Sequence, residues 1–293
     1  MTARTPTTTP STTPASAPVQ TLDIVSADGS RLVGHVQGHG PPVVLVHGAL
    51  GDGDLNWDAL LPHLTEHLTC ITMSTRGRGP SAPGSDYSHE RRVEDVLAFL
   101  AGVGGPVGLM GHSGGALLAL GVAAHEDAAS ALSGVFVYEP PAFEVLDEVG
   151  FARLGETIAR IGAAAAEDRL TDGAQILIED IAQANTEELA DADLPRWAET
   201  WAETVPVFLE EVAHLGHGQS ATDPTRLGRI TAPTHVAYGA ETGPRFAASA
   251  THVIEYLADP HPVVLAGVGH LAPQLAPASV AGPMIRAFSQ GPT

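Results

Sequence analysis

The chain has 293 residues, of which 44% are hydrophobic, enough for one large domain or for a core carrying an inserted module. It has 34 acidic residues against 14 basic ones, all of them arginine, and a formal net charge of −20. This excess of negative charge repels phosphate backbones and anionic lipid surfaces, so it argues against nucleic-acid binding and against membrane-surface binding.

The first twenty residues are rich in Thr, Pro, Ser and Ala and lack the apolar region of a secretory signal. We therefore expect a disordered tail over residues 1–20. No apolar run approaches the ~20 residues needed to span a bilayer. The one cysteine, Cys70, cannot form an internal disulfide. These features favour a cytoplasmic location.

Strands and helices alternate in the pattern expected after this tail. Two strands at 21–26 and 31–37 flank Ala27-Asp28-Gly29, which is typical of a hairpin. Short apolar runs predict further strands, of the buried type, at 43–47, 69–74, 107–110 and 135–138. Helices are expected between them, at 57–67, 91–100 and 116–120. Such alternation predicts an α/β fold with a mostly parallel sheet and helices on both faces.

Between residues 142 and 230 the pattern changes, because no run there reads as a strand. Helical segments rich in Ala and Glu dominate, and Pro195, Pro206 and Pro224 divide them into short helices. This region is predicted to be a helical lid inserted between core segments 21–141 and 231–293, the second of which contains strands at 235–238 and 262–265. Trp197, Trp201, Val205 and Phe208 form an apolar stripe in the lid; it is a packing face or the lining of a substrate pocket.

The segment Gly111-His112-Ser113-Gly114-Gly115 lies between an expected strand and an expected helix. A G-x-S-x-G sequence in that setting is a nucleophile elbow, a turn so tight that side chains beside the serine would clash. Ser113 is therefore the candidate nucleophile.

A serine hydroxyl needs a base, and Gly269-His270 provides one in the loop after the last strand. Of the fourteen histidines, only His270 has this setting. The pairs His63/His67 and His214/His217 lack a third ligand, so no metal is expected. No nucleotide-binding G-x-G-x-x-G context is present either, and no cofactor is expected.

His47-Gly48, the segment 76–81 (RGRGPS), the elbow and Gly269-His270 together resemble the serine-nucleophile α/β-hydrolases of the esterase, lactonase and peroxidase-like group. The resemblance implies the α/β-hydrolase fold. It also implies an oxyanion hole, formed by the backbone N–H of Gly114 after the nucleophile and that of Ala49 in the loop after the third strand.

The acid that orients the histidine has two candidates. In this family it usually follows the strand after the lid, where Thr242 stands, with Glu241 one position early. A second location is the end of the strand after the elbow helix, and Glu139-Pro140 there resembles the glutamate-proline turn of some haloalkane dehalogenases. We favour Glu139, with Glu241 as runner-up.

We therefore expect a cofactor-independent serine hydrolase that cleaves a small-molecule carboxylic ester or lactone through an acyl-enzyme. The same residues could serve an acyltransferase, a perhydrolase or a C–C hydrolase. In a different class, the fold can act as a ligand-binding receptor or scaffold. The sequence leaves the oligomeric state open.

Overall fold

The computed structural model describes residues 19–128, 130–184, 189, 192–214 and 220–289. The disordered tail expected at 1–20 lies outside these residues except for its last two positions. The second of these, Gln20, already belongs to the first strand, so the predicted boundary of the tail is too late.

Within these described residues, eight strands form one sheet in the order β1-β2-β4-β3-β5-β6-β7-β8. Their bounds are β1 Gln20–Val25, β2 Arg31–Gly38, β3 Pro42–Val46, β4 Thr69–Ser74, β5 Val107–His112, β6 Leu132–Tyr138, β7 Thr234–Gly239 and β8 Pro260–Leu265. Strand β2 pairs antiparallel with β1 and with β4, and every other pair is parallel. The predicted hairpin and the mostly parallel sheet are confirmed.

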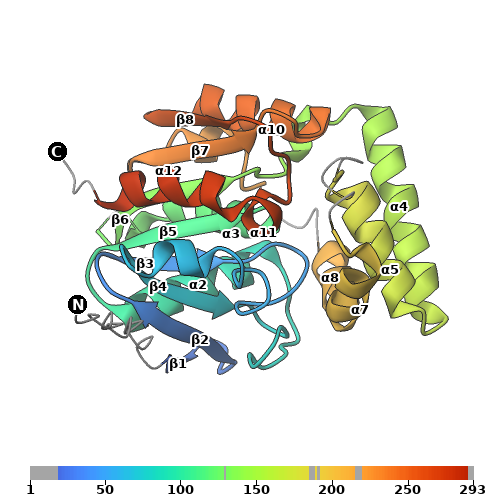
Figure 1. Ribbon diagram of the computed structural model, residues 1–293, viewed down its shortest axis with the longest axis horizontal. Helices are drawn as coiled ribbons and strands as arrows, with labels where there is room; N and C mark the ends of the chain where they lie inside the picture. The colour runs from blue at the N-terminus through green and yellow to red at the C-terminus, as the bar shows by residue number, and fades with distance from the viewer. Residues whose placement is uncertain (1–18, 129, 185–188, 190–191, 215–219, 290–293) are drawn as a thin grey trace, which may run out of the picture.

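Helices connect the strands and pack on the sheet (Figure 1). Their bounds are α1 Leu61–Leu64, α2 His89–Val103, α3 Gly114–Ala123, α4 Glu148–Ala166, α5 Leu170–Ile176, α7 Leu194–Trp201, α8 Val205–Ala213, α9 Pro224–Leu227, α10 Pro244–Tyr256, α11 Ala272–Leu275 and α12 Pro277–Ser289. Shorter helical turns are η1 Glu126–Ala128, η2 Phe143–Val145, η3 Leu177–Ile181 and η4 Ala202–Thr204. In the described part of the chain, no helix is both long and apolar enough to cross a membrane.

The helix predicted at 57–67 was wrong in extent, because only α1 is helical there. Pro62 occupies the first turn of α1, where its missing N–H is tolerated, and in a longer helix it would break the hydrogen-bond ladder. The flanking residues form hydrogen-bonded turns instead, such as Leu60 N–H to the Trp57 carbonyl at 2.9 Å.

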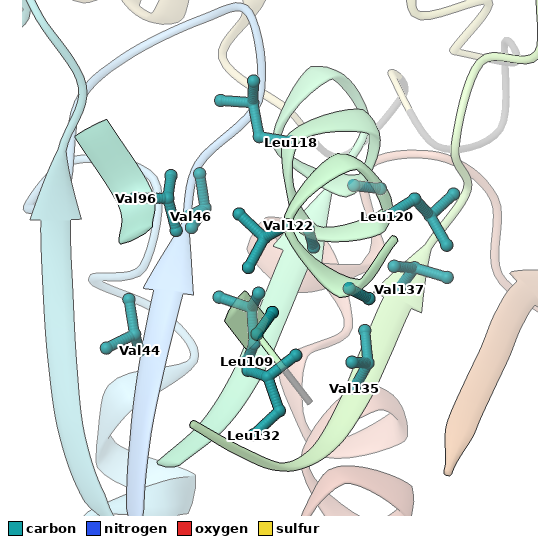
Figure 2. Packing of buried hydrophobic residues seen from close by; sticks show 14 of the residues in the cluster. Val44, Val46, Val96, Leu109, Leu118, Leu120, Val122, Leu132, Val135 and Val137 are labelled. Carbon is teal, nitrogen blue, oxygen red and sulfur yellow. The ribbon is translucent and has the colours of Figure 1, made fainter. Parts of the chain in front are cut away.

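The apolar runs of the central strands are buried on both faces of the sheet. Val44 and Val46 of β3 pack under α3, together with side chains from β5 and β6 (Figure 2). Val43 and Leu45 point to the opposite face and join a second cluster with α1 and α12, because successive strand residues alternate between faces. This double burial explains why these strands are almost continuously apolar.

The described part of the segment between β6 and β7 is mainly helical, and α4, α5, α7 and α8 gather to one side of the sheet (Figure 1). Pro195, Pro206 and Pro224 lie in the first turns of α7, α8 and α9, as expected for residues that start helices. The expectation of short helices only was wrong for α4, which runs for 19 residues because no proline interrupts it.

Candidate active site

Ser113 stands between β5 and α3 with a strained backbone, φ 53° and ψ −119°. Such a conformation costs on the order of 1–3 kcal/mol and needs close packing to hold it. A Cβ on Gly111 would lie 2.4 Å from the Gly115 carbonyl oxygen, and one on Gly115 would lie 2.2 Å from the Val46 carbonyl oxygen. Both glycines of the motif are therefore sterically required for this turn.

His270 and Glu139 form a buried pair. The distance from His270 Nδ1 to Glu139 Oε2 is 2.7 Å, and the two side chains are 3% and 0% exposed. Glu139 follows β6 directly and also has a positive φ, 51°. The Gly239 N–H donates to Glu139 Oε1 at 2.9 Å, and the Thr242 hydroxyl donates to Oε2 at 2.8 Å.

Of the two candidate acids, the structure therefore brings Glu139 to His270, while Glu241 is exposed. Thr242, at the position where relatives usually carry the acid, contacts the Glu139 carboxylate instead of replacing it. A residue in the loop after β7 thus donates a hydrogen bond to a carboxylate that directly follows β6.

Three residues that the sequence did not single out hold the His270 loop. Tyr138 donates its hydroxyl to the Gly269 carbonyl at 2.5 Å, and His112 Nε2 lies 3.0 Å from the His270 carbonyl oxygen. The Phe246 ring stacks on the imidazole at 3.9 Å between centroids. His112 occupies the variable position of the elbow motif. Its position directly before Ser113 is the sequence feature that could have indicated its role in holding this loop.

Burial governs the protonation of this pair. Desolvation lowers the pKa of His270 and the Arg245 charge acts in the same direction, so the imidazole is neutral at neutral pH. Desolvation raises the pKa of Glu139, whereas its bonds from Gly239 and Thr242 lower it. A neutral imidazole that donates from Nδ1 to the carboxylate keeps a lone pair on Nε2, as a general base requires.

The loop after β3 lies beside Ser113. The Ala49 nitrogen is 3.7 Å from the point where a Cβ on Gly114 would stand, so the two expected oxyanion donors are neighbours. His47 stabilises this loop from below, since its Nδ1 lies 2.8 Å from the Gly48 carbonyl oxygen and its Nε2 accepts from the Thr75 N–H at 3.1 Å. Burial lowers the pKa of His47 to about 4, which keeps this histidine neutral.

A buried charge cluster joins the same loop to α8. Arg78 donates to the Ala49 carbonyl at 2.7 Å and pairs with Glu211 of α8 at 3.2 Å. Arg92 of α2 pairs with the same Glu211 oxygen at 3.1 Å. The cluster connects the helical segment to both α2 and the loop at Ser113.

Two cavities meet at Ser113. The larger has a volume of about 110 Å³ and includes Ala49, Gly114 and Arg245 in its wall. Its apolar lining comes from the core and the helical segment: Leu117, Phe143, Leu154, Ile158, Phe208 and Val212. The smaller, of about 30 Å³, includes His270 and Trp201. Trp201 and Phe208 belong to the predicted apolar stripe. Both are buried in the packing of the helical segment, and each also lines one of the two cavities.

Among the described residues, no three His, Cys, Asp or Glu side chains come together as a metal site would require. Two histidine pairs were considered as metal ligands, His63/His67 and His214/His217. The second pair cannot be placed, because His217 lies outside the described residues.

A model of the alpha/beta hydrolase family matches residues 43–282, and the chain belongs to this family. A crystal structure of an alpha/beta hydrolase from Sphaerobacter thermophilus superimposes with a TM-score of 0.73 at 27% identity, covering 91% of this chain and all of the other. The fold and the resemblance expected from the sequence are thereby confirmed.

Curated relatives match over a shorter stretch. The chain is 34% identical over 101 residues to 2-hydroxy-6-oxo-6-(2'-aminophenyl)hexa-2,4-dienoic acid hydrolase of Metapseudomonas resinovorans, covering 32% of this chain and 35% of that protein. It is 32% identical over 94 residues to pyrrolizixenacetamide deacetylase of Xenorhabdus hominickii, covering 30% and 34%. The match thus spans about a third of the length of these relatives. The family model shows the family of the chain, and several of the proteins that it resembles are named as hydrolases.

Proposed function

We propose that this hydrolase cleaves a carboxylic ester or lactone with Ser113 as nucleophile, His270 as general base and Glu139 as the acid that orients the histidine. The observation that carries this proposal is the buried 2.7 Å contact between Glu139 and His270, whose imidazole lines the same small cavity as Ser113. Esters and lactones suit a site whose described residues offer a nucleophile, a base and backbone donors.

In the proposed first step, Ser113 Oγ attacks the carbonyl carbon while His270 Nε2 takes the hydroxyl proton. The N–H groups of Ala49 and Gly114 stabilise the oxyanion, and His270 then protonates the departing alcohol. Glu139 stabilises the imidazolium without taking its proton. Water attacks the resulting acyl-enzyme and releases the acid.

The helical segment at 142–230 is proposed to be a lid over this site. Its residues Leu154, Ile158, Phe208 and Val212 supply much of the apolar wall of the larger cavity. An apolar wall beside the nucleophile favours a hydrophobic acyl group and excludes bulk water from it.

The test is Ser113→Ala with short p-nitrophenyl esters and a fluorophosphonate probe. We expect turnover to fall by about 10³-fold or more and labelling to disappear, while circular dichroism stays unchanged. Retained ester turnover in Ser113→Ala would overturn the proposal. A wild-type protein that neither turns over esters nor reacts with the probe would instead favour the receptor or scaffold alternative.

A second candidate is hydrolysis of a C–C bond in a substrate that carries a carboxylate. Arg245 favours it, because this half-buried cation lines the larger cavity and has no acidic side chain within 4 Å among the described residues. Its Nη2 donates to the Ile181 carbonyl at 2.5 Å, and its buried Nε has no partner in the same part of the chain. Burial lowers the pKa of Arg245 to about 10. An uncompensated cation beside the nucleophile is suited to an anionic group, and one relative is named for a dienoic acid substrate.

Arg245→Met tests the carboxylate-binding role on which the C–C candidate rests. If the substrate carries a carboxylate, KM for acidic substrates rises about tenfold or more while that for neutral esters changes little. Exposed Arg160→Met on α4 is the matched control. Equal effects of Arg245→Met on acidic and neutral substrates would contradict the C–C candidate.

A further inference from the structure

The smaller cavity behind Ser113, here called the small chamber, is lined by Asn56, His112, His270 and Gln274, among others. Three of these residues carry a buried polar atom without a hydrogen-bond partner in the described part of the chain. These atoms are Asn56 Nδ2, His112 Nδ1 and Gln274 Oε1. Buried polar atoms are nearly always hydrogen-bonded in folded proteins, so three of them around one cavity require a polar occupant.

The bonds that these side chains do make determine what the three atoms offer. His112 Nε2 donates to the His270 carbonyl at 3.0 Å, so in the neutral ring Nδ1 is an acceptor. This Nδ1 atom lies 3.6 Å from where a Cβ on Gly48 would stand, and Gly48 also lines the small chamber. Gln274 Nε2 donates to the Asn56 carbonyl at 3.3 Å, which leaves Oε1 as an acceptor. Asn56 Nδ2 is a donor.

One donor and two acceptors match a water molecule, which donates two hydrogen bonds and accepts others. The chamber volume of about 30 Å³ holds roughly two waters, since one needs about 10–15 Å³ by the same measure. An alkyl chain of any length would not fit and would leave all three atoms unpaired.

The two cavities also differ in their access to the base. Ser113 lines both, but His270 is among the walls of the small chamber and not among those of the larger cavity. The group that attacks an acyl-enzyme must give its proton to His270, so it has to approach from the side of the small chamber.

We infer that the small chamber binds the water that hydrolyses the acyl-enzyme, with Asn56 and Gln274 as its positioning residues, while the acyl group occupies the larger cavity. This inference rests on the proposed serine-hydrolase function. The water oxygen forms a bond to the acyl carbon as His270 Nε2 takes one of its protons. The bond from that carbon to Ser113 Oγ then breaks, Ser113 recovers the proton from His270, and the product leaves as a carboxylic acid.

The experiment measures how the acyl-enzyme partitions between water and methanol added as a competing nucleophile. Gln274→Met keeps the length of the side chain but removes the acceptor. Water uses this acceptor with its second proton, whereas the one hydroxyl proton of methanol goes to His270, so water alone should attack less well. We expect the ratio of methyl ester to free acid to rise about fivefold, the loss of roughly one hydrogen bond. Gln274→Glu restores an acceptor oxygen and should return the ratio towards wild type. Both products form on one acyl-enzyme, so altered acylation cancels from the ratio.

Asn56→Leu, which removes a donor that water and methanol both accept, is the second variant and should slow deacylation to both products; thermal unfolding shows which variants are folded. An unchanged ratio in folded Gln274→Met overturns the role of the chamber, as does unchanged deacylation in folded Asn56→Leu or a rise that Gln274→Glu does not reverse. With Ser113→Ala inactive in the same assay, such a result leaves the proposed function standing. If Ser113→Ala keeps forming both products, the proposed function fails and the inference fails with it.

Discussion

At the residue scale, the position of the Glu139 carboxylate is fixed by burial and by hydrogen bonds to both of its oxygens. Glu139 is fully buried, it has a positive φ at the end of β6, and both carboxylate oxygens accept hydrogen bonds. The second oxygen is shared by the Thr242 hydroxyl and the His270 imidazole. This arrangement selects the imidazole tautomer with hydrogen on Nδ1, and loss of the negative charge would remove that selection.

We therefore predict that Glu139→Gln lowers kcat by about 10³–10⁴-fold, because an amide can present its N–H to His270 and favour the wrong tautomer. Glu241→Gln at the exposed runner-up position should change kcat less than threefold. Thr242→Val should give a smaller loss than Glu139→Gln, since it removes one of several bonds to the carboxylate. Steady-state kinetics on all three variants provide the measurement, and a larger loss in Glu241→Gln would reverse the assignment.

At the scale of elements, α8 is tied to the core by charge as well as by apolar packing. Glu211 is buried and pairs with Arg78 and Arg92, and Arg78 in turn holds the Ala49 carbonyl. Desolvation raises the pKa of Glu211, but the two guanidinium groups outweigh it and leave the pKa lowered. The buried carboxylate is thus charged, and among the described residues it is the acidic side chain that pairs with Arg78 and Arg92.

Glu211→Gln should accordingly destabilise the protein by about 3–5 kcal/mol, because it leaves buried cations uncompensated. The neighbouring exposed Glu210→Gln is the matched control and should change stability by less than about 0.5 kcal/mol. Urea denaturation of the three proteins measures the difference. Equal unfolding midpoints for the two variants would show that the cluster does not anchor α8.

At the scale of the whole molecule, buried histidines set how stability depends on pH. Desolvation, the largest cause for each, lowers the pKa of His47 to about 4 and those of His89 and His112 to about 3, against 6.5 for an ordinary histidine. Between pH 6.5 and about 4 the unfolded chain binds protons at these positions and the folded protein does not. Stability therefore falls as the pH is lowered through this window. Glu139, whose pKa is raised to about 7, acts in the opposite direction over part of it.

We predict that the free energy of unfolding decreases from pH 7 to pH 5, each such histidine contributing about 1.4 kcal/mol per pH unit below 6.5. Denaturant titrations at several pH values give the slope. His89→Gln removes one of these histidines and should reduce the slope by the contribution of one histidine, about 1.4 kcal/mol per pH unit. A slope that is flat in the wild type, or identical in His89→Gln, would contradict this account.

The sequence by itself determined the sheet and the elbow, and it named Ser113 and His270, which line one cavity in the structure. These depend on signals carried by neighbouring residues, namely apolar runs, turn glycines and a motif whose steric requirement is local. The predicted bounds of helices were less accurate. The helix expected at 57–67 is much shorter, as α1, and α4 is longer than expected because no proline interrupts it. The stretch with prolines, by contrast, divided as predicted, because proline acts on its own turn of helix.

Only the tertiary structure decided which carboxylate meets His270, since Glu139 and Glu241 both follow strands at the same end of the sheet. The pairing of β6 with β7 places Gly239 and Thr242 within hydrogen-bond distance of Glu139, and this contact holds Glu139 in position beside His270. The two cavities, the Glu211 cluster and the unpaired atoms of the small chamber were likewise invisible in the sequence. Each depends on side chains far apart along the chain, such as Asn56 and Gln274, which come into contact only when the whole chain has folded.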